Sequence, residues 1–353
     1  MAIRVGTYDL SSLLAVANQS AAEFGADRIQ EILAADLAAH NRIVREDLLA
    51  ELVDVTGDAM RVAGASTGGE MMEVDEYGAA PTQKEAVPGS LGTPLKLFQY
   101  NIGWTEKYMQ VATPADVARS TIGAQTAHLR GIKREIQRAF YRSGNYTFVD
   151  KLVNSVTLPI KRLANADSFP IPDGPNGETF DSTAHTHYTG TATLTVAGIQ
   201  AVIDNVVEHG VEGPVRLAIS TTNETAFRAL GAPFVAATDV RLIQSTTTLR
   251  TVEPLDMTRM NDRMIGRFGA AEVWVKPWAI ANYAVAYDAG ASAKPLSFRQ
   301  RTNEALQGLR IAAENSLFPL NARFMEAEFG VAVWNRTKMA VLYFANGTYA
   351  DAL

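Results

Sequence analysis

Two histidines near the middle of the chain are the residues best placed to bind a metal ion. His185 and His187 stand two positions apart in the segment STAHTHYTG. On a strand this spacing directs both imidazole rings to one face, and neutral imidazole is a common ligand of transition metals. The flanking residues are polar and indicate no third ligand nearby. We therefore interpret the two residues as a solvated pair and predict no bound metal, with a soluble metal-dependent α/β enzyme as an alternative.

Other sequence patterns do not support catalysis. Residues 64–68, Gly-Ala-Ser-Thr-Gly, match the G-x-S-x-G pattern of hydrolases. That pattern requires a strand before the serine and a helix after it, whereas a glycine-rich acidic segment follows here. No phosphate-binding loop and no dinucleotide-binding glycine pattern occurs. The chain has no cysteine, which excludes disulfides, thiolate catalysis and cysteine-ligated zinc. We predict a protein that is not an enzyme and has no cofactor.

The composition is that of a soluble globular protein of about two domains. The chain has 353 residues, of which 47% are hydrophobic and 20% charged, and its formal net charge is −6. This acidic balance argues against a protein whose main task is binding nucleic acid, because phosphate neutralisation requires clustered Lys and Arg. The N-terminus lacks the pattern of a signal peptide, and no run of about 18 apolar residues occurs. We expect neither secretion nor a membrane-spanning segment.

The longest helical pattern in the chain runs from Pro114 to Arg142. Thr113 is a good N-cap, Pro114 suits the first helical position, and Asp116 favours the positive end of the helix dipole. Apolar residues recur at steps of three and four, which predicts one buried face. That stripe comprises Ile122, Gln125, Leu129, Ile132, Ile136, Ala139 and Phe140. The opposite face carries Arg130, Lys133, Arg134, Arg138 and Arg142. It is either a solvated face that complements the dipole or a contact surface for an acidic partner segment.

An acidic segment and an aromatic strand precede this helix. Residues 62–79 are rich in glycine and small residues, and their acidic side chains are Glu70, Glu73, Asp75 and Glu76. After a turn region the chain alternates, so that one face of a strand carries Phe98, Tyr100, Ile102 and Trp104. We interpret the two segments as a hairpin with a long loop. An isolated hairpin is marginally stable, so its aromatic face needs an apolar surface, which for a projecting hairpin belongs to another subunit.

The remaining segments predict N-terminal helices and a mixed α/β region. Helices over 11–22 and 26–53 form either an arm that packs on a neighbour or along the outside of the body, or two ordinary core helices. Thr195 caps a helix that ends near Gly210, and a helix from Thr221 to Leu230 follows a buried strand. The predicted strands lie at 148–159, 215–219, 271–275, 283–287, 296–301, 325–333 and 339–344.

The order of these elements resembles the major capsid protein of tailed bacteriophages, with the Hong Kong 97-type shell fold. The resemblance spans nearly the whole chain and rests on organisation, together with the endings KPWAIANYAVAYDAG and ARFMEAEFGVAVWNRTKMAVLYF. It implies an α+β fold with an arm, an extended loop, a spine helix within a peripheral domain, and an axial domain. The implied boundaries are 1–61 for the arm, 62–112 for the extended loop, 113–190 and 317–353 for the peripheral domain, and 191–316 for the axial domain.

The resemblance also implies a structural role. Subunits of that family form pentamers and hexamers and close into an icosahedral container for double-stranded DNA. The implied partners are a scaffolding protein, a portal and packaged DNA held by weak non-specific contact, with no membrane, and the protein would belong to the virion after assembly in the host cytoplasm. Some members crosslink through a Lys–Asn isopeptide bond. Lys84 and Lys96 lie in the corresponding loop, but no matching Asn or catalytic acid is assigned, so we predict no crosslink. An encapsulin-type nanocompartment, which shares the fold and encloses enzymes, is a further alternative.

The two most charged stretches predict the subunit interface. In one subunit a projecting acidic hairpin would point away from the basic helix, so each set would lack an internal partner. We expect the hairpin of one subunit to lie across the helix of the next, with charges setting orientation and apolar contacts supplying most of the affinity. The predicted interface residues are Glu70, Glu73, Asp75, Glu76, Phe98, Tyr100, Ile102, Trp104, Arg130, Lys133, Arg134 and Arg138.

Overall fold

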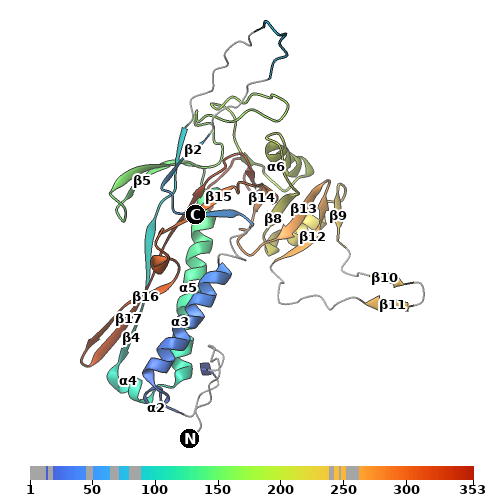
Figure 1. Ribbon diagram of the computed structural model, residues 1–353. Coiled ribbons are helices and arrows are strands. Elements are labelled where there is room, and N and C mark those ends of the chain that lie inside the picture. Colours follow the sequence, from blue (N-terminus) through green and yellow to red (C-terminus); the bar gives the residue numbers. More distant parts are fainter. Residues whose placement is uncertain are drawn as a thin grey trace.

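A long helix, α5, and two β-sheets organise the chain (Figure 1). The structure is a computed structural model that describes residues 13–14, 19–44, 51–63, 71–78, 89–237, 242–245, 248–251 and 262–353. Helix α3 and the long strands β4 and β17 run beside α5, and the second sheet lies toward the C-terminal end of that helix. The predicted α+β class is confirmed. No helix among the described residues is long and apolar enough to cross a membrane.

Helix α5 spans Pro114–Tyr141 and begins as its sequence predicts. Thr113 and Asp116 form a capping box, in which the Asp116 carboxylate accepts hydrogen bonds from the backbone N–H and hydroxyl of Thr113. The predicted buried stripe is only partly right, because Ile122 and Leu129 are 37% and 38% exposed. Small side chains occupy much of the buried face instead, and they allow neighbouring strands and helices to approach closely. The buried residues include Ala118, Thr121, Ala124, His128, Gly131, Ile132, Ile136, Ala139 and Phe140.

The N-terminal helices lie along this chain's own α5. Helix α2 spans Ala21–Phe24 and begins with a Ser20–Glu23 capping box, and α3 spans Ala26–Ile43. One face of α3 buries apolar residues that form a cluster with Ala118 of α5. Leu37 of α3 and the following Val44 also belong to the main core, so both predicted arrangements, an arm and core helices, stay predictions. The predicted helix over 26–53 is too long, because Val53 already belongs to strand β1.

The first sheet has the order β1–β15–β17–β16, and β4 also pairs with β17. Its strands are β1 (Val53–Thr56), β15 (Leu296–Gln300), β17 (Leu320–Val333), β16 (Arg310–Leu317) and β4 (Lys96–Thr105). Strand β17 is antiparallel to β4, β15 and β16, whereas β1 and β15 are parallel. The sheet therefore joins segments from both ends of the chain and packs against α5 through a shared core that contains Ile132, Phe298 and Phe329.

Strand β4 does not form the predicted hairpin with the acidic segment. Phe98 stacks on Phe329 of β17 with ring centroids 4.3 Å apart, and the Tyr100 hydroxyl lies over Gly123 of α5, where an added Cβ would be 3.2 Å away. The aromatic face therefore already has an apolar surface in its own subunit. The hairpin after β1 consists instead of β2 (Met60–Ala63) and β3 (Gly89–Gly92), with residues 71–78 in the connection between them. Beside it lies a second hairpin, β5 (Tyr146–Asp150) with β6 (Val156–Ile160).

The second sheet has seven strands in the order β7–β18–β14–β8–β13–β12–β9. They are β7 (Tyr188–Gly190), β18 (Met339–Tyr343), β14 (Tyr283–Asp288), β8 (Val215–Ile219), β13 (Ala271–Val275), β12 (Arg263–Phe268) and β9 (Phe234–Ala236). Helix α6 (Val196–Val207) covers one face, where it packs on alternate residues such as Leu217, Ala286 and Leu342. The intervening residues, including Val285 and Val341, belong to the core shared with α5.

Several local predictions for this region hold and others are wrong. The Thr195 hydroxyl accepts a hydrogen bond from Gly198 N at the start of α6, as predicted. The helix predicted from Thr221 is a 3₁₀ turn followed by the short α7, Glu224–Arg228. The short strands β10 (Leu242–Ser245) and β11 (Thr248–Thr251) lie on the same side of the molecule as the second sheet (Figure 1). The predicted domain boundaries stay predictions, although β15 and β16 pair with β17, and β18 pairs with β14.

Candidate functional site

The exposed basic face of α5 is one candidate contact surface. Arg130, Lys133 and Arg134 are exposed and have no ion pair among the described residues. Arg138 differs, because it pairs with Glu135 at 2.9 Å, and the buried Glu135 also pairs with Lys96 of β4 at 2.5 Å. The prediction that all four cations lack an internal partner is therefore wrong for Arg138. The available basic surface consists of the other three side chains.

The acidic connection between β2 and β3 is the second candidate surface. Every residue from 71 to 78 is exposed, including Glu73, Asp75 and Glu76, whereas Glu70 lies outside the described residues. The same segment exposes large apolar side chains that the sequence analysis did not single out. Their exposed fractions are 103% for Met71, 53% for Met72, 50% for Val74 and 90% for Tyr77. The segment is thus both acidic and apolar, which is the composition expected of a docking element.

A third exposed surface lies at the turn between β16 and β17 and was missed from the sequence. Leu317, Phe318 and Leu320 are 74%, 82% and 61% exposed. Helix α4 (Glu106–Val111) follows β4 beside this turn, and Glu106 N donates a hydrogen bond to Pro319 O at 3.0 Å. The sequence signal is the apolar run Leu-Phe-Pro-Leu at residues 317–320, which stands between the polar residues Ser316 and Asn321. We call Leu317, Phe318 and Leu320 the apolar tip.

The aromatic residues of β4 are less available than predicted. Phe98 and Ile102 are partly buried against the main core, and the Arg323 guanidinium lies 5.6 Å from the ring centre of Trp104. Tyr100 is 36% exposed. The reason for assigning the four residues to an interface, the lack of an internal apolar surface, is wrong for Phe98 and Ile102. A role at an interface stays a prediction for their exposed edges.

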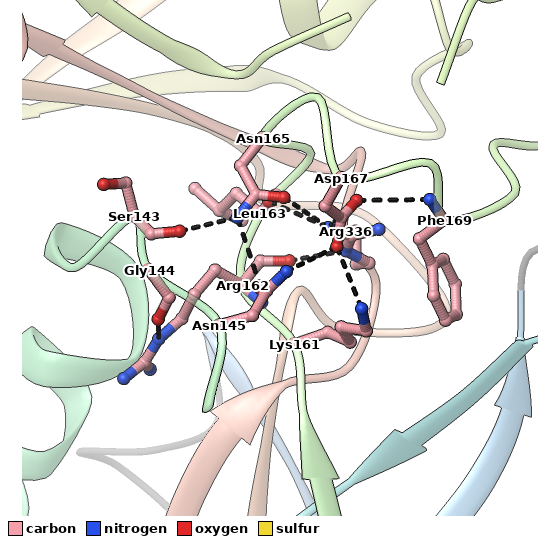
Figure 2. A network of polar contacts seen from close by, with 10 residues as sticks. All are labelled: Ser143, Gly144, Asn145, Lys161, Arg162, Leu163, Asn165, Asp167, Phe169 and Arg336. Atoms are coloured by element: carbon pink, nitrogen blue, oxygen red, sulfur yellow. Dashed lines mark hydrogen bonds and ion pairs between the residues drawn. The ribbon is translucent and has the colours of Figure 1, made fainter. Parts of the chain in front are cut away.

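A polar network fixes the C-terminal end of α5 to the loops beside the second sheet (Figure 2). The Arg336 guanidinium donates hydrogen bonds to Arg162 O at 2.5 Å, to Asn165 Oδ1 at 3.0 Å and to Asp167 Oδ1 at 2.9 Å. Arg162 in turn donates to Ala139 O of α5 at 3.1 Å. Burial opposes the charge of Asp167, but Arg336, Asn145 and Lys161 together outweigh it and hold the pKa of this carboxyl below its usual range. The network is a rigid junction and has no free nucleophile.

Three histidines and a glutamate form the one group of possible metal ligands among the described residues. His185 and His187 lie in the turn before β7, and Glu208 and His209 follow directly after α6. The Nε2 atom of His185 is 3.0 Å from that of His187 and 3.0 Å from that of His209, and the third edge of this triangle is 3.1 Å. The Glu208 Oε1 atom is 3.6 Å from His185 Nε2 and 3.8 Å from His209 Nε2. We call these four residues the histidine cluster.

Burial keeps these imidazoles neutral. It lowers the pKa of His185, and burial with the neighbouring His209 lowers the pKa of His187 well below its usual value. Burial, His185 and Lys338 lower the pKa of His209 to about 4. The prediction of a solvated pair is therefore wrong, because His187 is 0% exposed. His209 follows His187 by 22 residues and returns to it only through α6, so spacing along the chain could not reveal it.

Comparison with solved structures shows that the fold of this chain is similar to that of a tailed-phage chain, from Mycobacterium phage Patience. A chain from Mycobacterium phage Patience has 19% sequence identity and a TM-score of 0.66, over 98% of this chain and 95% of that chain. The resemblance found in the sequence is thus confirmed at the level of the fold.

Two other solved structures are less similar. The capsid of a native GTA particle has 13% identity and a TM-score of 0.44, over 86% of this chain and 90% of that chain. The holo-SrpI encapsulin complex from Synechococcus elongatus has 11% identity and a TM-score of 0.43, over 89% and 90%. No protein-family model and no curated protein matches the sequence. The fold assignment rests on the Patience chain alone.

Proposed function

We propose that this chain is the major capsid protein of a tailed phage. Its subunits form hexamers and pentamers and close into an icosahedral shell around double-stranded DNA. The observation that carries this proposal is the likeness to the Mycobacterium phage Patience chain, with a TM-score of 0.66 over 98% of this chain. Exposed apolar residues at two separate places support it, because such groups mark surfaces that associate with other proteins. The role is structural and requires no catalysis.

The proposed subdivision follows the Hong Kong 97-type fold. The arm is 1–61, the extended loop 62–112, the peripheral domain 113–190 with 317–353, and the axial domain 191–316. Strand pairing favours two changes to these bounds. Strands β15 and β16 would move to the peripheral domain, because they pair with β17. Strand β18 would move to the axial domain, because it pairs with β14. Helix α5 is the spine helix in this scheme, and the β2–β3 hairpin is the stem of the extended loop.

The acidic connection of one subunit docks on the basic face of α5 in the next subunit. Glu73, Asp75 and Glu76 oppose Arg130, Lys133 and Arg134 in this arrangement, while Met71 and Tyr77 supply apolar contact. Exposed ion pairs contribute about 0–1 kcal/mol each, so the charges set orientation and the apolar residues supply most of the affinity. A closed shell repeats the contact at every subunit, so small terms accumulate.

The partners proposed for this shell are a scaffolding protein, a portal and packaged DNA, and assembly takes place in the host cytoplasm to give a virion component. A net charge of −6 supports weak contact with DNA, because tight binding would require the lining to neutralise many phosphates. We expect free subunits to bind DNA only weakly and with strong salt dependence. Shells that protect double-stranded DNA from nuclease fit the proposal, whereas shells that contain only protein cargo favour a nanocompartment.

The first experiment replaces residues 71–78 by a Gly/Ser segment of equal length in the full chain. Negative-stain microscopy of the unaltered protein should show rings or shells, and the replaced protein should remain as soluble subunits. A longer deletion is unsuitable because Leu91 in β3 is 1% exposed and belongs to the subunit's own core. Thermal unfolding of the free subunits is the control and should not change. Shells of normal size from the replaced protein would rule out this contact.

A charge exchange tests the docking partner. The change Glu73→Lys with Glu76→Lys should raise the protein concentration at which light scattering first reports assembly. Adding Arg130→Glu and Arg134→Glu to the same chain should recover part of the loss, because opposite charges again face each other. Arg138 is left unchanged because it pairs with Glu135 within the subunit.

The matched control places the same compensating charge elsewhere. Arg42, exposed on α3, and Lys151, exposed in the β5–β6 turn, are both changed to Glu. This control should not recover assembly of the protein that carries Lys at 73 and 76. Equal recovery by both sets would mean that net charge alone governs assembly, and the specific contact would be refuted.

A further inference from the structure

The histidine cluster has ring nitrogens that converge on one point. His187 Nδ1 lies 2.8 Å from Met339 O, so this nitrogen carries the proton and donates it to the carbonyl. The Nε2 lone pair of His187 is therefore free and faces the Nε2 atoms of His185 and His209. A backbone carbonyl that fixes the tautomer in this way is the usual second contact of a metal-binding histidine.

Hydrogen bonding alone does not satisfy this arrangement. The single lone pair of His187 Nε2 can accept one N–H, from either His185 or His209. The Nε2 atom of the other histidine then lies about 3 Å from both of these nitrogens without a hydrogen bond to His187. The Oε1 atom of Glu208 is buried and has no hydrogen-bond partner among the residues that the structure describes. Buried polar atoms almost always have a hydrogen-bond partner or a bound ion. A cation bound between the Glu208 oxygen and the three histidine nitrogens would supply the missing partner.

The spacing fits a tetrahedral metal ion. Zn²⁺ binds imidazole nitrogen at about 2.0–2.1 Å, which places two tetrahedral ligand nitrogens about 3.3 Å apart. The three nitrogens lie 3.0–3.1 Å from one another, and the Glu208 oxygen lies 3.6 and 3.8 Å from two of them. Shifts of a few tenths of an ångström would bring the three nitrogens to coordination distance, and the half-exposed Glu208 carboxylate, whose ligand atom lies within 4.8 Å of all three, would move further. We propose that His185, His187, His209 and Glu208 bind one divalent transition-metal ion, with zinc as the best fit.

The site is closed and structural. Four protein ligands fill a tetrahedral shell and leave no position for a substrate or a reactive water, so the geometry does not favour a metal-dependent enzyme. The Phe180 ring covers the cluster, with its centroid 4.1 Å from that of His209. The ion would tie the end of α6 to the turn that leads into β7, the edge strand of the second sheet. It would thereby stabilise this sheet's edge in the subunit and in the shell.

The test uses untagged full-length protein, freed of metal by a chelator that is then removed. Zinc is titrated against a chromogenic competitor, and thermal unfolding is recorded with and without zinc. We expect one equivalent of zinc per chain and a higher unfolding midpoint, because a ligand that binds only the folded state stabilises it. Cobalt in place of zinc should give the strong visible absorption of a tetrahedral site. Free subunits suffice, so the result does not depend on whether the protein forms shells.

Three variants separate the site from general histidine binding. His185→Gln and Glu208→Gln change ligands whose side chains are 15% and 37% exposed, so both should fold, as far-ultraviolet circular dichroism of the metal-free proteins checks. Each should lower zinc affinity at least about 10–100-fold, the loss known for removal of a mere outer-shell partner. His40→Gln, a histidine on α3 outside the cluster, is the matched control and should bind like the unaltered protein. Absence of stoichiometric zinc binding, or equal affinity in all three variants, would overturn the proposal.

Discussion

The substitution Phe318→Ser at the apolar tip separates assembly from folding. Phe318 is 82% exposed at the turn between β16 and β17, and its neighbours Leu317 and Leu320 are 74% and 61% exposed. The phenyl ring therefore contributes little to the core of the isolated subunit. Surface substitutions away from special features usually change stability by about 0.5 kcal/mol or less. We expect the free energy of unfolding of the free subunit to stay within that range.

The expected effect on assembly follows from the exposed area. Full burial of a Phe side chain stabilises by about 1.5–3 kcal/mol, and 82% of this side chain remains to be buried by a neighbouring subunit. If the interface buries most of it, the loss per contact is about 1–2 kcal/mol. Since about 1.4 kcal/mol corresponds to a factor of ten, the threshold concentration for assembly should rise by roughly 5- to 30-fold.

The assay is light scattering over a dilution series, with urea unfolding of the free subunits in parallel. Phe318→Leu is the matched control, because it keeps an apolar side chain and should assemble near the normal threshold. Assembly of Phe318→Ser at the threshold of the unaltered protein would refute a contact through this ring. A loss of several kcal/mol of subunit stability in that variant would also refute it, because the ring would then belong to the core.

Two further predictions concern the stability of the subunit itself. Arg299→Met removes the ion-pair partner that lies 2.7 Å from the buried carboxylate of Asp150. The free energy of unfolding, measured in urea, should therefore fall by about 3–5 kcal/mol. Adding Asp150→Asn should restore part of that free energy, and equal stability of the single and double variants would contradict the prediction. Burial and His40 lower the pKa of His128 from 6.5 to about 4. As the pH falls, the unfolded chain therefore binds a proton at this residue before the folded chain does. The contribution of neutral His128 to the free energy of unfolding is complete above pH 6.5 and is lost as the pH falls toward 4. His128→Gln should reduce the loss of unfolding free energy between pH 7 and pH 4 by about 3 kcal/mol, and an unchanged pH profile would count against the buried pair.

Local signals predicted the long helix and many strands because the chemistry that fixes them is local. The Thr113 cap with Asp116 marks the start of α5 in the sequence as clearly as in the structure. The buried face was harder to predict, because hydrophobicity selects Ile122 and Leu129, whereas close packing selects small residues such as Ala118 and Gly131. The segments that pack against α5 determine whether the face with Ile122 and Leu129 or the face with Ala118 and Gly131 is buried.

Strand partners and the histidine cluster could not be predicted for a related reason. β4 pairs with β17, more than 200 residues later, and both strands alternate in ways that fit several partners. The cluster needs α6 to bring His209 back to His187, and no spacing rule encodes that return. Most of the wrong predictions therefore concern contacts between segments that are far apart in the sequence. One example is the predicted lack of an apolar surface for Phe98, which stacks on Phe329.

The positions of the exposed surfaces bear on how copies of this chain associate. Residues 71–78 and the turn between β16 and β17 lie at opposite ends of the molecule (Figure 1). A two-fold dimer formed through one of these surfaces would leave the other in water. Head-to-tail contacts, in which a tip of one subunit meets a different surface of the next, bury both and generate closed rings when the rotation between subunits closes. In the proposed shell, a small change in that rotation would separate a hexamer from a pentamer. The distribution of exposed apolar side chains thus favours head-to-tail contacts between copies of this chain over a two-fold dimer.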